Sequence, residues 1–301
     1  MCSFAKDKGK QITKILWKCQ LSHFFLYEYL HCCSEQIECV FLRRIAVRKA
    51  ILLLIAASLT FPAVVLAEKD RLAATHDLTY MSKYMTKGKE GYGQQGVFFE
   101  TVDIDLWGTG FGTAVTHQAA TGSGWVNKAR FNYKVYYSGS VFDDLTYETK
   151  YKISWEYKHY YDEPRNSRNV YAWKFVSSWP KVLRPTGLTP YYISHYEYPA
   201  GSGYKNLVDH WAGWVHRFGV EYDLKTSELP QPIHLTSEIA YTDGLRAADH
   251  DFSFATFGLS TKIQIDENLA FVPGLYHQVS MDDSVCKRDV TYCILSMKYK
   301  F

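Results

Sequence analysis

The sequence predicts an all-β protein: a transmembrane, antiparallel up-and-down β-barrel of about twelve strands that ends on a phenylalanine. Aromatic residues make up 16% of the 301 residues, yet the mean hydropathy is only -0.24. This combination is typical of a chain in which apolar and polar residues alternate. Alternating segments recur behind a segment typical of secretion, and the chain ends on one of them, "VTYCILSMKYKF".

Residues 43–67 have the features of a secretory signal peptide. A basic stretch precedes an apolar run over residues 50–61, and a proline follows the run. Val65 and Ala67 suit the small-residue positions of a cleavage site, so we expect cleavage after Ala67. An uncleaved membrane anchor is the alternative, because the apolar stretch is close to the shortest that can span a bilayer.

Residues 1–42 precede this complete signal and contain five of the seven cysteines. We expect that translation begins shortly before Arg43, that residues 1–42 are an upstream extension, and that residues 68–301 form the barrel. The exported part would carry 25 basic and 27 acidic residues, a balance that does not indicate nucleic-acid binding. Its two cysteines, Cys286 and Cys293, could form a local disulfide or stay free thiols.

Alternation of period two predicts the strands. We expect them at residues 76–87, 96–107, 110–119, 126–138, 146–161, 169–179, 187–198, 210–224, 233–243, 251–264, 268–281 and 290–301. The segment 146–161, "TYETKYKISWEYKHYY", shows the pattern most clearly, with rings on one face and charges on the other. Tight connections such as 108–110 and 266–268 lie at one end of the strands, and longer polar loops lie at the other, as in outer-membrane barrels.

The polar face of each strand is predicted to line the lumen, because a Lys or Arg at the bilayer midplane costs about 2–4 kcal/mol. The lumen-lining candidates are polar side chains opposite the rings: Asp103, Asp105, Arg130, Lys134, Lys150, Lys152, Glu156, Lys158, Arg217, Glu221, His234, Glu238, Lys262 and Lys298. Their modest basic excess favours anions in a pore. Small residues on this face are expected to leave room for solutes: Ala172, Gly213, Gly219, Gly258 and Gly274.

The last segment resembles the assembly signal of bacterial outer-membrane proteins. Phe301 ends the chain, and Tyr299 and Met297 share its face. The resemblance implies that the barrel-assembly machinery of a Gram-negative-type envelope is a partner.

Three further segments resemble the TorF-like family of outer-membrane proteins. They are "HDLTYMSKYMTKGKE", "SEIAYTDG" with "DHDFSFATFGLS", and "LAFVPGLYHQVSMDDSV" before "SMKYKF". The resemblance covers most of residues 75–301 and implies a twelve-strand-like barrel with a channel role. It offers no catalytic residues to transfer.

Catalytic, metal and cofactor motifs are absent from the sequence. No His-x-Ser pair occurs, although barrel hydrolases use such a pair on one strand. Metal-ligand spacings of the Cys-x-x-Cys and His-Glu-x-x-His kinds are missing too. The row His234, Thr236 and Glu238 is interpreted as an ordinary polar lumen row. The "DHDFS" segment at 249–253 could bind a cation or form a protease rim, but a solvated loop is the favoured reading.

These features predict a passive channel for small polar solutes in the outer membrane, with its lipid bilayer as the surroundings. We expect no enzyme activity, no cofactor and no nucleic-acid partner. A structural or adhesive barrel with a filled lumen is the alternative, and a barrel hydrolase comes third.

Overall fold

The computed structural model describes residues 72–122, 124, 129–162, 168–200 and 211–301, all within one unit, Ala67–Phe301. The predicted upstream extension and signal peptide lie outside the described residues and stay predictions. Within the described ranges, no helix is both long and apolar enough to span a membrane.

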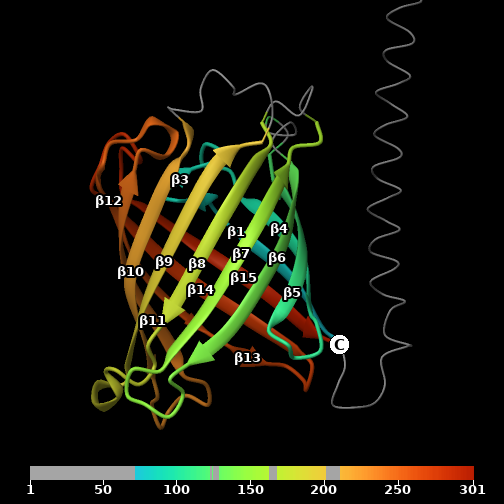
Figure 1. Cartoon of the computed structure of the whole chain (residues 1–301), viewed down its shortest axis with the longest axis vertical. Coiled ribbons are helices and arrows are strands. Elements are labelled where there is room, and N and C mark those ends of the chain that lie inside the picture. Colours follow the sequence, from blue (N-terminus) through green and yellow to red (C-terminus); the bar gives the residue numbers. More distant parts are fainter. Residues whose placement is uncertain (1–71, 123, 125–128, 163–167, 201–210) are drawn as a thin grey trace, which may run out of the picture. The chain divides into compact units, whose positions relative to one another are not determined.

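The described chain forms one closed antiparallel barrel, which confirms the predicted fold (Figure 1). Its twelve long strands are β1 (Ala73–Met81), β4 (Val97–Asp105), β5 (Phe111–Ala120), β6 (Arg130–Val141), β7 (Thr149–His159), β8 (Val170–Ser178), β9 (Leu188–Pro199), β10 (Gly213–Leu224), β11 (Ile233–Asp243), β12 (Asp251–Thr261), β14 (Leu269–Ser280) and β15 (Val290–Lys300). Each strand pairs with the next one along the chain, and β15 pairs with β1, so no edge is left open.

Short elements lie in the connections. The two-residue strand β13 (Ile263–Gln264) extends the pairing with β14. Strands β2 (Met85–Thr86) and β3 (Lys89–Glu90) form a small hairpin between β1 and β4. Two 3-10 turns, η4 (Arg184–Thr186) and η6 (Leu245–Ala247), follow β8 and β11. We call the end at which β1 begins and β15 ends the terminal mouth, and the opposite end the loop mouth.

The first strand was predicted wrongly at its end. It stops at Met81 rather than at residue 87, because the chain turns back through the β2–β3 hairpin. Lys87 and Gly88 make that turn with φ of 50° and 80°, in the left-handed region. The segment 146–161 is also shorter than predicted, since its strand covers only Thr149–His159.

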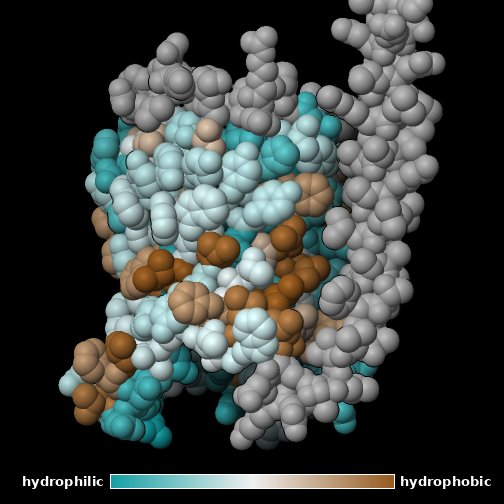
Figure 2. Space-filling view, turned by 45° about the vertical axis from the view of Figure 1, so that its right-hand side comes forward, coloured by the Kyte–Doolittle hydropathy of each residue, from teal (hydrophilic) through white to brown (hydrophobic). Residues whose placement is uncertain are grey.

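The outward face of the barrel is apolar. Phe98, Val135 and Phe218 point outward from three strands and are 49%, 52% and 50% exposed. Figure 2 shows hydrophobic residues gathered in a band across one side, with paler residues above and below it. An exposed apolar surface that runs around a barrel needs a lipid environment, because soluble monomers rarely expose patches of this extent.

Aromatic rings form a continuous row on the outward face near the loop mouth. The ring of Tyr133 on β6 packs on Tyr157 of β7, which packs on Tyr171 of β8. The row continues to Tyr198 and Tyr196 of β9, and neighbouring ring centroids are between 5.2 and 6.4 Å apart. Membrane barrels carry such girdles at the level of the lipid headgroups.

One carboxylate interrupts the outward face of the long strands away from their ends. Glu100 on β4 points outward, between Leu78 of β1 and His117 of β5 in the register. Its Oε1 lies 3.4 Å from Nε2 of His76, which also points outward. An ionisable group on this face is costly unless it has a partner.

Candidate functional site: a lumen closed at one end

The register places most lumen-lining candidates on the inward face. Inward positions hold Asp103 and Asp105 on β4, Arg130 and Lys134 on β6, Lys150, Lys152, Glu156 and Lys158 on β7, Arg217 and Glu221 on β10, His234 and Glu238 on β11, and Lys298 on β15. Lys262 lies outside the long strands, in the exposed step between β12 and β13. The assembly-signal residues Met297 and Tyr299 point outward, and the Phe301 ring packs on Tyr299 at 4.8 Å.

Glu197 of β9 lies in the lumen near the loop mouth and organises the charged side chains around it. The sequence analysis did not identify this residue. Its side chain is completely buried, and it forms ion pairs with Lys158 of β7 and with Lys87 of the β2–β3 hairpin. Arg246 Nη2 donates to the second carboxylate oxygen over 3.0 Å. A buried carboxylate is stable only when it is paired and hydrogen-bonded, and here three cations satisfy that need.

His195 adds a fourth nitrogen to this cluster. Its Nε2 lies 3.4 Å from Glu197 Oε1, although this contact lacks hydrogen-bond geometry. Lys158 reaches Glu197 from two strands away because Ala172 of β8, which lies between them, has too small a side chain to separate them. The alanine that was expected to leave room for solutes therefore leaves room for an ion pair.

Two connections fold into the loop mouth and supply the other cations. We call residues 82–96 and 244–250 together the plug. Lys87 comes from the first connection and Arg246, with φ of 58°, from the second. Burial lowers the pKa of the Lys87 ammonium well below its ordinary value, and the Glu197 carboxylate opposes that shift.

The first plug segment docks on the barrel wall through hydrogen bonds. Arg130 Nη2 donates to the Tyr84 hydroxyl over 2.8 Å, and Gln118 Nε2 donates to the Tyr92 hydroxyl over 2.7 Å. The two tyrosine rings stack at 4.8 Å. Burial raises the pKa of the Tyr92 phenol, so this group stays neutral.

Gly88 lies at the tip of the β2–β3 hairpin and lets this tip pack closely against the barrel wall. Gln278 Nε2 donates to the Gly88 carbonyl over 2.8 Å, and a β-carbon at Gly88 would lie 2.3 Å from the Phe254 ring. Only glycine combines this close approach with φ of 80°. The second plug segment packs Leu245 and Ala248 into an apolar cluster with Phe254.

Exposure of the inward side chains increases toward the terminal mouth. Lys158 is 6% exposed and Glu197 is fully buried, whereas Lys134 is 29% and Lys150 is 62% exposed. The lumen is therefore closed at the loop mouth and accessible to water toward the terminal mouth.

The inward glycines do not leave room, contrary to the sequence-based expectation. A β-carbon at Gly219 would lie 2.3 Å from the Tyr191 ring, and one at Gly258 would lie 2.4 Å from the Tyr276 ring. The rings lie over the glycines of neighbouring strands, as large side chains commonly do in sheets. Gly213 is covered by the backbone of Leu245.

The residues considered for catalysis are separated. His234 Nδ1 lies 2.8 Å from Asp223, whereas Glu238 accepts from Arg217 over 3.3 Å and from Tyr191 over 3.0 Å. His250 of the "DHDFS" segment pairs with Asp243 at the exposed rim. No group of three metal-ligating side chains occurs among the residues that the structure describes. These contacts are ion pairs and hydrogen bonds of the wall and rim.

Cys286 and Cys293 are both free, so the disulfide alternative is not formed. The Cys286 thiol donates to the Arg288 carbonyl over 3.1 Å. Cys293 points outward from β15, on the face opposite Tyr292.

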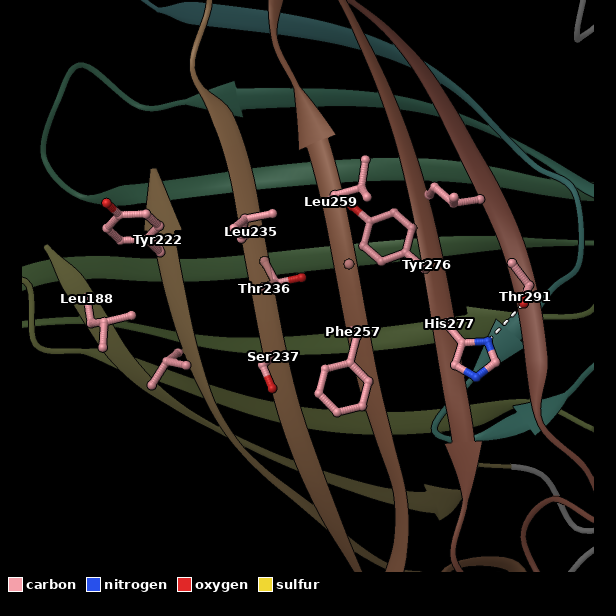
Figure 3. Close-up of a pocket in the computed structure, with 13 residues that line it drawn as sticks. Leu188, Tyr222, Leu235, Thr236, Ser237, Phe257, Leu259, Tyr276, His277 and Thr291 are labelled. Carbon is pink, nitrogen blue, oxygen red and sulfur yellow. Dashed lines mark hydrogen bonds between the residues drawn. The ribbon is translucent and has the colours of Figure 1, made fainter. Parts of the chain in front are cut away.

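A concavity lies on the outward face, over strands β9 to β15. It measures about 580 Å³ and is lined largely by apolar side chains such as Leu235, Phe257 and Leu275. Figure 3 shows its polar edge, where His277 turns toward Thr291, with Nδ1 and Oγ1 2.8 Å apart. Its largely apolar lining suits lipid chains, and the inward residues Thr236, Gly258 and Tyr276 form part of its wall.

Comparison with known proteins returns barrels. No family model matches the chain, and no curated protein matches it. Among solved structures, the KdgM porin is 11% identical, covering 75% of this chain and 99% of that chain with a TM-score of 0.46. The NanC porin is 10% identical, covering 75% and 100% with a TM-score of 0.46. The outer-membrane phospholipase A of Escherichia coli is 11% identical, covering 79% and 92% with a TM-score of 0.41. The resemblance to the TorF-like family stays a prediction.

Proposed function

We propose that this protein is an outer-membrane channel for small polar solutes, and that the plugged arrangement is its closed form. The single observation that carries the proposal is the character of the plug. Two connections hold the loop mouth shut through cations that meet on one carboxylate, Glu197. A barrel that only needed a filled interior could use apolar packing, which avoids the desolvation of buried charge.

The wall below the plug supports passage of polar solutes. Inward side chains there are charged or hydroxylated and accessible to water, as Lys134, Asp103 and Lys150 illustrate. Channel selectivity in such pores comes from the charges that line them. In this proposal the terminal mouth faces the periplasm and the loop mouth faces the outside of the cell.

Electrical recording of the protein purified from membranes tests the proposal. In a planar bilayer the unmodified protein should open rarely. Glu197→Gln should open far more often, because the carboxylate charge that holds Lys87 and Arg246 is removed. Lys87→Met provides a second route to the same result if the first variant folds poorly. Glu221→Gln is the control, since Glu221 also points inward and lies outside the plug.

A filled structural barrel that presents its loops is the second candidate. The observation in its favour is that hydrogen bonds from Gln118, Arg130 and Gln278 also hold the plug. If neither the unmodified protein nor the two plug variants pass current while all remain folded, the channel proposal fails and this candidate replaces it.

A further inference from the structure

We propose that the lumen contains a binding site for a small oxyanion, built around Lys152 and Lys174 directly below the plug. The site would take a sulfate, phosphate or carboxylate group of a solute. The route by which an anion reaches it rests on the proposed channel function, because the closed plug leaves the terminal mouth as the entrance. Binding itself does not require the channel to open.

The two lysines occupy neighbouring inward positions around one small residue. Lys174 of β8 adjoins Ser154 of β7 in the register, and Lys152 lies two residues from Ser154 on the same inward face. Neighbouring strands are about 4.8 Å apart, so both flexible side chains can reach one point above Ser154. The Ser154 hydroxyl, in a residue only 7% exposed, adds a donor there.

Neither lysine has a carboxylate partner within ion-pair distance in the part of the chain that the structure describes. Three nearby acids pair with other cations: Asp103 lies 3.6 Å from Lys134, Glu156 lies 3.6 Å from Lys158, and Glu238 lies 3.3 Å from Arg217. A fourth, Asp105, accepts a hydrogen bond from the Gly108 backbone N–H over 2.7 Å. Lys152 Nζ instead lies over the Tyr136 ring, 3.4 Å from its centroid.

Further positive charge surrounds the same point. Lys174 interacts electrostatically with three cations, Arg217 of β10, Lys134 of β6 and Lys152, and with one carboxylate, Glu156, which is itself paired with Lys158. Four strands of one wall thus direct cations into one part of the lumen. Like charges repel unless an anion lies between them, and ammonium and guanidinium groups form their strongest hydrogen bonds with oxyanions.

The depth of this site links it to the plug. Lys174 pairs in register with His195, and Glu197 follows two residues later on the same inward face of β9. An anion held by Lys174 therefore lies one inward position below the carboxylate that closes the lumen. A solute entering by the terminal mouth would meet this site before it reached the plug.

Calorimetric titration of the folded, detergent-solubilised protein with sodium sulfate tests the proposal. Sodium acetate is titrated in parallel to separate dianions from carboxylates, and sodium chloride keeps the ionic strength equal. We expect saturable sulfate binding that Lys152→Met and Lys174→Met each weaken by about tenfold or more. Lys150→Met is the matched control, because Lys150 is on the same face of β7 but 62% exposed and close to Glu148. Its affinity should stay within about twofold of the unmodified protein.

Lys152→Arg and Lys174→Arg keep the charge and should retain binding, which covers the case of a methionine variant that misfolds. Absence of saturable binding by the unmodified protein overturns the site. An equal loss of affinity in Lys150→Met also overturns it, because the effect would then be one of general charge. If the unmodified protein binds sulfate but neither it nor the plug variants pass current, the channel proposal is wrong and the anion site is supported. If current is recorded but no saturable binding is found, the anion site is wrong and the channel proposal is supported.

Discussion

Glu100 is an exception to the alternation of the strands, because it places a charged side chain on the apolar outward face. It is a carboxylate in an apolar outward face, with His76 at 3.4 Å as its partner. Both side chains are only partly exposed, at 29% and 27%. If the pair is an incidental polar contact, replacing the acid by an apolar residue should relieve a desolvation cost.

We therefore expect Glu100→Leu to raise the free energy of unfolding by about 1 kcal/mol, measured by urea unfolding in lipid vesicles. Glu100→Gln, which keeps the shape and loses the charge, should lie between the leucine variant and the unmodified protein. A loss of stability in the leucine variant would show instead that the pair holds β1 and β4 together.

The hairpin β2–β3 is the element whose position decides whether the lumen is closed. Gly88→Val should displace the hairpin from the lumen. The valine β-carbon would clash with the Phe254 ring, and φ of 80° is unfavourable for valine. This variant changes none of the charged residues of the plug, so any effect comes from the position of the hairpin. Limited trypsin digestion should then cut after Lys87 and Lys89, which the unmodified protein should protect.

Gly108→Val is the control for this experiment. Gly108 has φ of 64° in the tight turn between β4 and β5, and nothing lies within 4 Å of the added carbon. The backbone strain is thus similar, but the plug is untouched and trypsin protection should remain. Equal cleavage in both variants would mean that general destabilisation, and not release of the hairpin, exposes the lysines.

The last strand, β15, closes the barrel, and Phe301, the residue that follows it, belongs to the predicted assembly signal. Phe301 donates its backbone N–H to the Ala74 carbonyl over 2.9 Å, and its ring packs on Tyr299. Phe301→Ser should lower the amount of folded barrel in the membrane, measured by heat-modifiable gel mobility. Lys300→Ser changes the adjacent inward residue and should not. Equal yields for the two variants would argue against a special role of the terminal ring.

Strands were predictable from the sequence because each strand repeats one local rule, alternation of apolar and polar side chains. The β2–β3 hairpin was not, because residues 82–87 were interpreted as the end of the first strand, whereas the structure ends β1 at Met81 and turns the chain back at Gly88. Glu197 was missed for a different reason. Nothing in "SHYEYP" distinguishes it from other inward acids, and its partners come from β7 and from two connections far away in sequence.

At the scale of the whole molecule, the sequence could predict that charges face inward but not that they close the lumen. Alternation fixes the face of each side chain. It does not show which inward side chains meet across a barrel, or which connections fold inward. The expectation that glycines leave room failed for this reason, since the tyrosines that cover Gly219 and Gly258 lie on neighbouring strands.

The proposed orientation of the barrel places the terminal mouth in the periplasm and the loop mouth outside the cell. Epitope insertion tests this orientation on intact cells. The end of β7 at His159 and the start of β8 at Val170 lie at the loop mouth, so an epitope inserted between these two strands should bind antibody on intact cells. One inserted within residues 225–232, between β10 and β11, lies at the terminal mouth and should bind only after permeabilisation. Residues 244–250 are unsuitable for insertion, because Arg246 of this segment binds Glu197. The reverse pattern would place the plug at the periplasmic end, so the closed mouth would face the periplasm rather than the medium.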